Sequence, residues 1–317
     1  MDKEIISALW DALEMSLSPD NESRRKAEKY VVDAMNMNGF CSAMLTIASN
    51  SEYNNNRKAD VSQAAAIQFK NMAETHWRFK NETHARDATC SGFRFIILQE
   101  EDKQYVRDNI LELILNCKNI TVVRQLNYAV ECIARLDFPD RWRSLAEQIH
   151  AYLATEDEKK IIIGLESLKS VWKRFEFEHD VGRKPLEEIV HNIFPRIEEI
   201  VGQLQTVDTE LAFDIKNRVG NLLYIVNQIN LCERYSSPEG LEKLLNFYKF
   251  GLEWSIDPSL IGKTDDTEVT LERNKRPEWK FKAISMRFMF RMFQKYGDPN
   301  MCSPEDKEMA TYFSKFL

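Results

Sequence analysis

The chain has 317 residues, of which 44% are hydrophobic and 29% charged, a composition typical of a globular protein. Its formal net charge of −7 argues against a nucleic-acid partner, because binding to the phosphate backbone needs a basic face. No apolar run is long enough to span a bilayer, and no basic segment precedes an apolar core at the N-terminus. We therefore expect an intracellular protein without a membrane or nucleic-acid partner.

The chain begins with short helices. Only ten Gly and nine Pro occur, which favours helices joined by short turns over a sandwich or barrel. Apolar residues at helical spacing predict a first helix from about Lys3 to Ser16, which Pro19 ends. A second predicted helix begins at about Glu22, and a third runs from Phe40 to Ala48.

The stretch from Arg57 to Trp77 predicts a helix that is apolar on more than half of its circumference. The residues on this broad arc are Val61, Ala64, Ala65, Ala66, Phe69, Met72, Ala73 and Trp77. The narrow polar arc that remains carries Gln63, Lys70, Asn71 and Glu74. A helix of this kind needs neighbours on several sides, so we expect it inside a stack of helices.

A polar segment followed by an apolar run, residues 78–99, comes after this helix. Phe93 to Leu98 could form a strand, but a single strand without a partner would leave a bare sheet edge, so we expect an ordered connection. The helical pattern returns from Glu101 to Asn116. Its buried arc is predicted to consist of Val106, Ile110, Leu113 and Ile114.

A helix from about Thr121 to Arg135 is followed by a corner, Phe138 to Trp142. Pro139 removes a backbone donor and disfavours helix at the residue before it. We expect Asp140 to cap the next helix, which runs to about Leu153.

Further helix pairs follow along the rest of the chain. The predicted helices are Glu158 to Phe175 with Pro185 to Leu204, Asp208 to Leu231 with Pro238 to Glu253, and Arg276 to Tyr296 with a last helix from Ser303. A polar segment from Ser255 to Lys275 interrupts them. Helix pairs that recur about every 40 residues are typical of HEAT arrays, in which each pair needs neighbours to bury its apolar faces. The sequence therefore predicts an all-α fold, a right-handed α-α superhelix (solenoid) of about six HEAT-type helix pairs.

No motif for catalysis, phosphate binding or metal binding occurs. Six scattered cysteines and five histidines without ligand spacing indicate buried thiols and no metal site. We expect no enzyme activity and no cofactor. Arg107 and Arg141 lie where stacked repeats use arginine to join neighbouring pairs, with partner binding as the alternative. The tryptophans expected to pack at corners are Trp77, Trp142, Trp172 and Trp279.

Two stretches resemble the importin-β (karyopherin-β) family of nuclear transport receptors. The first is Gln63-Ala64-Ala65-x-x-x-Phe69-Lys70-Asn71 with Trp77 at the helix end, which is similar to the family's N-terminal domain. The second is the corner Phe138-Pro-Asp-Arg-Trp142, which resembles the corner of the third repeat. This corner and the later segment Arg276-Pro-Glu-Trp-Lys280, with Phe293-x-x-Tyr296-Gly297, are most similar to the importin seven/eight branch.

The resemblance implies a receptor that binds the GTP form of the small GTPase Ran and shuttles basic protein cargo between cytoplasm and nucleus, past the nucleoporins of the nuclear pore. It assigns residues 1–116 to the Ran-binding N-terminal domain and 117–317 to further HEAT repeats, in a chain that we expect to be part of a longer array. Two alternatives remain open: an exportin of the same family, or a HEAT scaffold without Ran binding.

By the same resemblance, the Ran surface lies on the second helices of the first three pairs. On the helix from Glu101 to Asn116, the residues opposite the buried arc are Asp108, Asn109 and Glu112. These three are the main candidates. Lys70 and Asn71, which match a Lys-Asn pair of the family, come next, although they could instead only join adjacent repeats.

Overall fold

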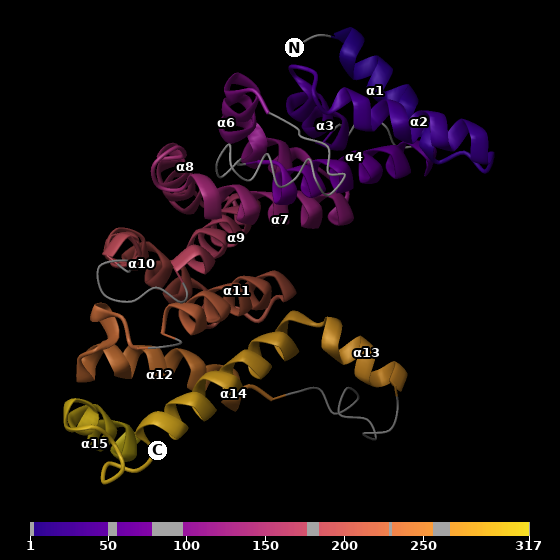
Figure 1. The fold of residues 1–317 in the computed structure, drawn as a ribbon. Helices are drawn as coiled ribbons and strands as arrows, with labels where there is room; N and C mark the ends of the chain where they lie inside the picture. Colours follow the sequence, from indigo (N-terminus) through magenta and orange to yellow (C-terminus); the bar gives the residue numbers. More distant parts are fainter. Residues whose placement is uncertain are drawn as a thin grey trace. The chain divides into compact units, whose positions relative to one another are not determined.

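The computed structural model describes residues 3–49, 56–77, 98–175, 184–227, 230–255 and 267–316. Within these ranges the regular structure is helical and there is no strand, which confirms the predicted all-α class (Figure 1). The predicted connection over residues 78–99 lies mostly outside the described residues. The chain forms two compact units, Met1–Tyr152 and Leu153–Leu317, and each is described by itself.

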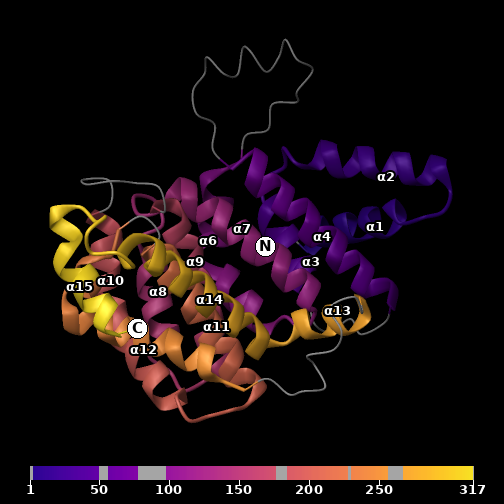
Figure 2. The same ribbon diagram turned by 90° about the horizontal axis from the view of Figure 1, so that it is seen from below.

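The first unit consists of successive helix pairs. Its helices are α1 (Lys3–Ser16), α2 (Asn21–Ala34), α3 (Phe40–Ser49), α4 (Asn56–Thr75), α6 (Glu100–Asn116), α7 (Ile120–Asp137) and α8 (Ser144–Leu153). Helices α1, α4 and α7 contact one another in that order and form one layer, whose members we call first helices (Figure 2). Helices α3 and α6 pack against each other in another layer, whose members we call second helices. Contacts of α3 with α4 and of α6 with α7 join the two layers.

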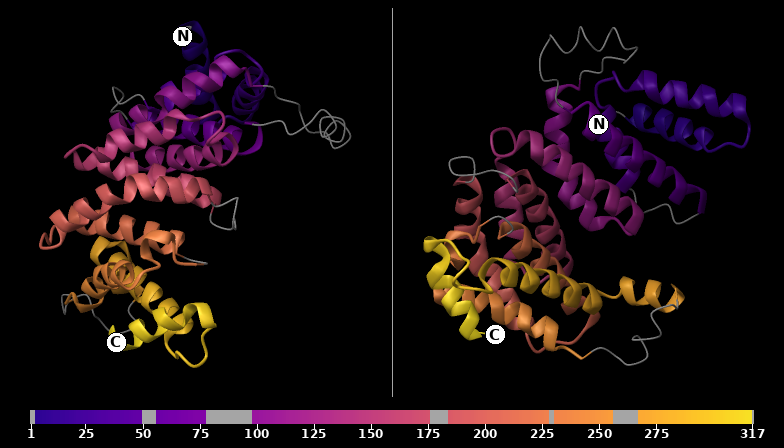
Figure 3. Two further views of the ribbon diagram at one scale, coloured as in Figure 1. Left: turned by 90° about the vertical axis from the view of Figure 1, so that its left-hand side faces the viewer. Right: turned by 60° about the horizontal axis from the view of Figure 1, so that its bottom comes forward.

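The second unit repeats this arrangement. Its elements are α9 (Glu158–Phe175), α10 (Lys184–Leu204), α11 (Glu210–Val226), η2 (Glu233–Tyr235), α12 (Pro238–Glu253), α13 (Thr267–Lys275), α14 (Pro277–Tyr296), η4 (Pro304–Asp306) and α15 (Lys307–Phe316). The first helices α9, α11 and α14 contact one another in order, and the second helices α12 and α15 also meet. The last pair, α14 and α15, is drawn in yellow in Figure 3. Contacts of α10 with α11 and of α12 with α14 join the layers of this unit.

Helix α4 shows why the pairs must stack. It packs against α1, α3 and α7. The members of its broad apolar arc that are fully buried are Val61, Ala65, Ala66, Phe69, Met72, Ala73 and Trp77. The small alanines let neighbouring helices approach on more than one side, as the sequence predicted.

Two predicted boundaries are wrong. Asp140 does not cap α8, which begins only at Ser144, because the backbone N–H groups of Arg141 and Trp142 both donate to the carbonyl of Asp137 and prolong the turn. The helix predicted over 208–231 ends at Val226.

The polar segment predicted as an interruption before α14 contains a helix, α13. Its first turn carries Glu268 and its last turn Arg273 and Lys275, so the charges complement the helix dipole. The Arg273 guanidinium lies 4.3 Å from the centroid of the half-buried Trp279 ring on α14. The charges at its ends and this contact with α14 stabilise α13, whose sequence has almost no apolar periodicity.

A carboxylate from α6 caps the N-terminus of α3. Asp102, 5% exposed, accepts hydrogen bonds from the backbone N–H groups of Cys41 at 2.8 Å and Ser42 at 2.9 Å. It also accepts one from the Ser42 hydroxyl at 2.6 Å. The first N–H groups of a helix have no partner within the helix, and the helix dipole favours a negative charge there. This contact fixes α6 against α3.

A second buried carboxylate joins three helices of the first unit. Arg107 on α6 and Asp137 at the end of α7 are each 2% exposed, and Arg107 Nη1 donates to Asp137 Oδ2 at 2.7 Å. The indole Nε1 of Trp77, just after α4, donates to the same oxygen at 2.8 Å. This confirms the structural interpretation of Arg107. Arg141, by contrast, is exposed and makes no ion pair with the described part of the chain.

In the second unit, helices α12 and α14 approach closely at a glycine. A Cβ atom at Gly251 would lie 2.3 Å from Ser285 Oγ and 2.9 Å from Phe281 Cε1. Three residues earlier, the Tyr248 hydroxyl donates to the carbonyl of Gly220 on α11 at 2.7 Å. The contact between these helices therefore requires a residue without a side chain.

We expect Gly251→Ala to lower the free energy of unfolding by about 1–2 kcal/mol, because overpacking a tight contact outweighs the gain in helix propensity. Gly202→Ala in α10 is the matched control, since a Cβ there meets nothing within 4 Å. That control should stabilise the protein by about 0.5–1 kcal/mol. Chemical denaturation checks both values, and a Gly251→Ala variant as stable as the parent chain would contradict the contact.

We expect Asp137→Ala to destabilise the first unit by about 3–5 kcal/mol, because it leaves the buried Arg107 guanidinium and the Trp77 indole without their acceptor. Asp108→Ala removes an exposed carboxylate from α6 and should change the stability by about 0.5 kcal/mol at most. Denaturant unfolding followed by hydrogen exchange in α4, α6 and α7 measures the loss. A loss below about 1 kcal/mol for Asp137→Ala would show that this network does not hold the helices together.

Candidate protein-binding site

Helix α6 presents a polar stripe to solvent. Its first turn is acidic, which favours helix formation at that end. Among the predicted candidates, Asp108 and Glu112 are exposed and lie one turn apart. Glu101 and Gln104, also exposed, extend the same face towards the N-terminus of the helix. We did not predict these two from the sequence, although their spacing from Asp108 places them on the same face of the helix.

The buried Arg107 side chain is hydrogen-bonded to this stripe. Gln104 accepts hydrogen bonds from Arg107 Nε at 3.2 Å and Nη2 at 2.9 Å, and its own Nε2 donates to Asp108 Oδ1 at 2.8 Å. Glu100 pairs with the same guanidinium. Arg107 therefore fixes the position of the Gln104 side chain, and Gln104 in turn orients Asp108 at the surface.

Asn109 and Glu112 have different surroundings. Asn109 is half-buried, and its Nδ2 donates to the carbonyl of Tyr105 at 2.8 Å, so its side chain is engaged within the helix. Burial raises the pKa of Tyr152, near the end of α8, and the charge of Glu112 raises it further. The charge of Glu112 thus acts on a residue of α8, whereas Asn109 is the weakest of the three candidates on α6.

Lys70 takes part in a contact between first helices. Its ammonium forms an ion pair with Glu74 at 3.5 Å and lies 5.5 Å from the centroid of the Tyr128 ring on α7. The Tyr128 hydroxyl donates to Glu74 Oε1 at 3.0 Å, and this hydrogen bond raises the pKa of Tyr128 to about 12. Asn71 beside it is exposed. The geometry at Lys70 fits the structural alternative, the joining of adjacent repeats.

The structure thus brings together the candidates on α6 but does not place Lys70 with them. Asp108, Asn109 and Glu112 belong to the layer of second helices, and Lys70 belongs to the contact between α4 and α7. The stripe on α6 is charged and exposed. It can therefore bind a surface of opposite charge, as a protein partner would present.

The described residues contain no arrangement suited to a metal or a membrane. Among them, no cluster of three or more His, Cys, Asp or Glu side chains could hold a metal ion. None of the helices in these ranges is long and apolar enough to cross a bilayer. Cys41, Cys132 and Cys232 are buried thiols, Cys117 and Cys302 are partly buried, and Cys90 lies outside the described residues.

Comparison with known proteins finds one family model and several relatives that are similar in sequence. Residues 27–116 match the importin-beta N-terminal domain. Importin-8 of Danio rerio is 27% identical over 265 residues, which cover 80% of this chain and 24% of that protein. The probable importin-7 homolog of Dictyostelium discoideum is 25% identical over 285 residues, 88% of this chain and 24% of that protein.

The fold of a solved exportin is also similar. The structure described as the exportin Cse1 in its cargo-free, cytoplasmic state matches with a TM-score of 0.73 and 17% identity, over 98% of this chain and 31% of that chain. The present chain spans about a quarter of the length of the curated relatives it matches. Residues 27–116 thus match the importin-beta N-terminal domain, and the chain is similar over most of its length to proteins named importin-8 and importin-7 homolog.

Proposed function

We propose that this chain is part of a nuclear import receptor that binds Ran in its GTP form through residues 1–116, while residues 117–317 form further HEAT repeats. The observation that carries the proposal is the match of residues 27–116 to the importin-beta N-terminal domain. The acidic stripe on α6, within that range, is the proposed contact for Ran. Asp108 and Glu112 are its principal residues, with Asn109, Lys70 and Asn71 as lesser candidates.

The proposed cargo is a basic protein. A formal net charge of −7 favours association with a positively charged partner and disfavours nucleic acid. The relatives named importin-8 and importin-7 homolog support an importer. A receptor of this kind contacts nucleoporins and is found in both cytoplasm and nucleus, and we propose the same for this protein.

A second candidate is an exportin, which the similarity to Cse1 favours. The two functions differ in the sign of the coupling between Ran and cargo. In an importer the GTP form of Ran lowers the affinity for cargo, whereas in an exportin it raises it. Measuring the retention of basic cargo on the receptor with and without Ran-GTP separates them. The third alternative, a HEAT scaffold, would bind Ran in neither nucleotide state.

We expect the double reversal Asp108→Lys with Glu112→Lys to weaken binding of Ran-GTP at low salt by about tenfold or more. Removing an exposed charge pair costs only about 0.2–1 kcal/mol, but the reversal adds repulsion to that loss. Because both side chains are exposed, the far-UV circular dichroism spectrum should not change. The association rate should fall more than the dissociation rate rises, and the difference should shrink as the salt concentration increases.

The matched control is Asp11→Lys with Glu14→Lys on α1, which makes the same change in net charge at two exposed positions of a first helix. This control should reduce the affinity for Ran-GTP by about threefold at most, because it changes only the overall electrostatic field of the protein. If both double variants bind Ran-GTP equally well at low ionic strength, the α6 stripe is not the contact.

A further inference from the structure

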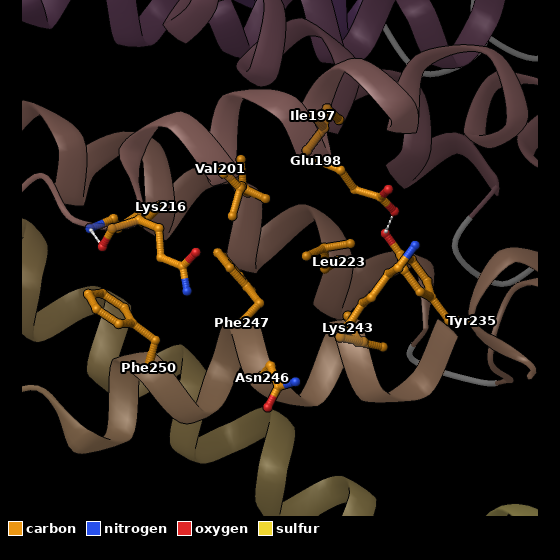
Figure 4. Close-up of a pocket in the computed structure, with 14 residues that line it drawn as sticks. Ile197, Glu198, Val201, Lys216, Leu223, Tyr235, Lys243, Asn246, Phe247 and Phe250 are labelled. Atoms are coloured by element: carbon orange, nitrogen blue, oxygen red, sulfur yellow. Dashed lines mark hydrogen bonds between the residues drawn. The ribbon is translucent and has the colours of Figure 1, made fainter. Parts of the chain in front are cut away.

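A cavity of about 380 Å³ lies in the second unit between α10, α11 and α12 (Figure 4). Its apolar walls include Val201 from α10, Leu223 from α11 and Phe247 from α12. In Figure 4 the side chains of Val201 and Phe247 point towards each other across its middle. The volume is within the range of pockets that hold a compact apolar group.

At one end of this cavity lies the carboxylate of Glu198, whose negative charge is balanced by Arg234. Glu198 accepts hydrogen bonds from Arg234 Nε at 2.8 Å and Nη2 at 2.7 Å, and from the Tyr235 hydroxyl at 3.2 Å. Burial tends to raise the pKa of Glu198, but these bonds and the nearby charges of Arg234 and Lys243 outweigh it, so the pKa is lowered. Lys243, exposed on α12, adds a second cation at this end.

The other end carries a buried cation. Lys216 is 1% exposed, and its ammonium donates to the carbonyls of Val207 at 2.9 Å and Gln205 at 3.5 Å. It also lies 4.5 Å from the centroid of the Phe250 ring, which lines the cavity. Burial lowers the pKa of Lys216, because the charged form is poorly solvated there.

The charges of the lining favour an anion. Glu198 is paired with Arg234, and the nearby charge of Asp208 partly offsets that of Lys216. Lys243 is therefore the exposed excess positive charge of this apolar cavity. This local excess of positive charge contrasts with the net charge of −7 of the whole chain. A ligand that joins an apolar group to carboxylates would complement both properties.

We propose that this cavity binds a protein segment in which a leucine-sized or larger apolar side chain is flanked by acidic residues. The apolar side chain enters between Val201, Leu223 and Phe247. One flanking carboxylate pairs with the exposed Lys243, and the second lies in the field of Lys216. A segment is the occupant that fits, because Lys243 and Asn246 are exposed at the rim, where a chain can cross and continue in both directions. The site is independent of Ran and lies outside residues 1–116.

The test uses the 317-residue chain with labelled valine and leucine methyl groups, followed by NMR. The probe is the blocked peptide acetyl-Ser-Glu-Leu-Glu-Ser-amide. Two matched peptides replace both glutamates by lysine, or the leucine by serine. We expect the acidic probe to shift the methyl signals of Val201 and Leu223 saturably and to bind about tenfold more tightly than either matched peptide. No saturable shift, or equal affinity of the lysine peptide, would overturn the proposal.

Two variants locate the binding. Gly202 lines the cavity, and a Cβ atom there meets nothing within 4 Å, so Gly202→Leu should fill the cavity without disturbing α10 and weaken the acidic probe by about tenfold or more. Lys243→Met should weaken it by about fivefold. Lys249→Met, on the same helix but outside the lining, should have no effect. Unchanged binding in a folded Gly202→Leu variant would place the probe elsewhere and contradict the proposal.

Discussion

No helix pair in the described part of the chain can bury its apolar surface alone, and the rest of the structure depends on that constraint. Helix α4 buries residues on several sides and therefore contacts α1, α3 and α7 at once. In the second unit, α11 has the same role, since it packs against both α9 and α14. The first helices therefore form a continuous layer of contacts within each unit.

Apolar stacking alone does not determine how far one helix slides along the next. Buried polar groups add this specificity in the first unit. Asp102 must meet the N-terminus of α3, and Asp137 must meet both Arg107 and Trp77, or each leaves a buried group unsatisfied. Arg107 also donates a hydrogen bond to Gln104, and Gln104 donates one to Asp108 at the surface. The candidate Ran contact is therefore positioned by a buried network.

Periodicity predicted most helices because burial follows the 3.6-residue repeat, as in α4 and α11. It missed α13, which is held by terminal charges and by Arg273 against Trp279. It also misplaced the start of α8, since the turn after Asp137 depends on hydrogen bonds that no local pattern indicates. For the site, the exposed face of α6 could be predicted from spacing. The role of Lys70 could not, because Tyr128 comes from another helix.

In the proposed function, the N-terminal repeats distinguish the nucleotide bound to Ran, with α6 as the contact. The most direct measurement is a calorimetric titration of this chain with Ran loaded with GTP and, separately, with GDP at one salt concentration. We expect saturable binding of the GTP form and an affinity for the GDP form that is at least about tenfold lower. Equal affinities for the two forms, or no binding of the GTP form, would contradict it.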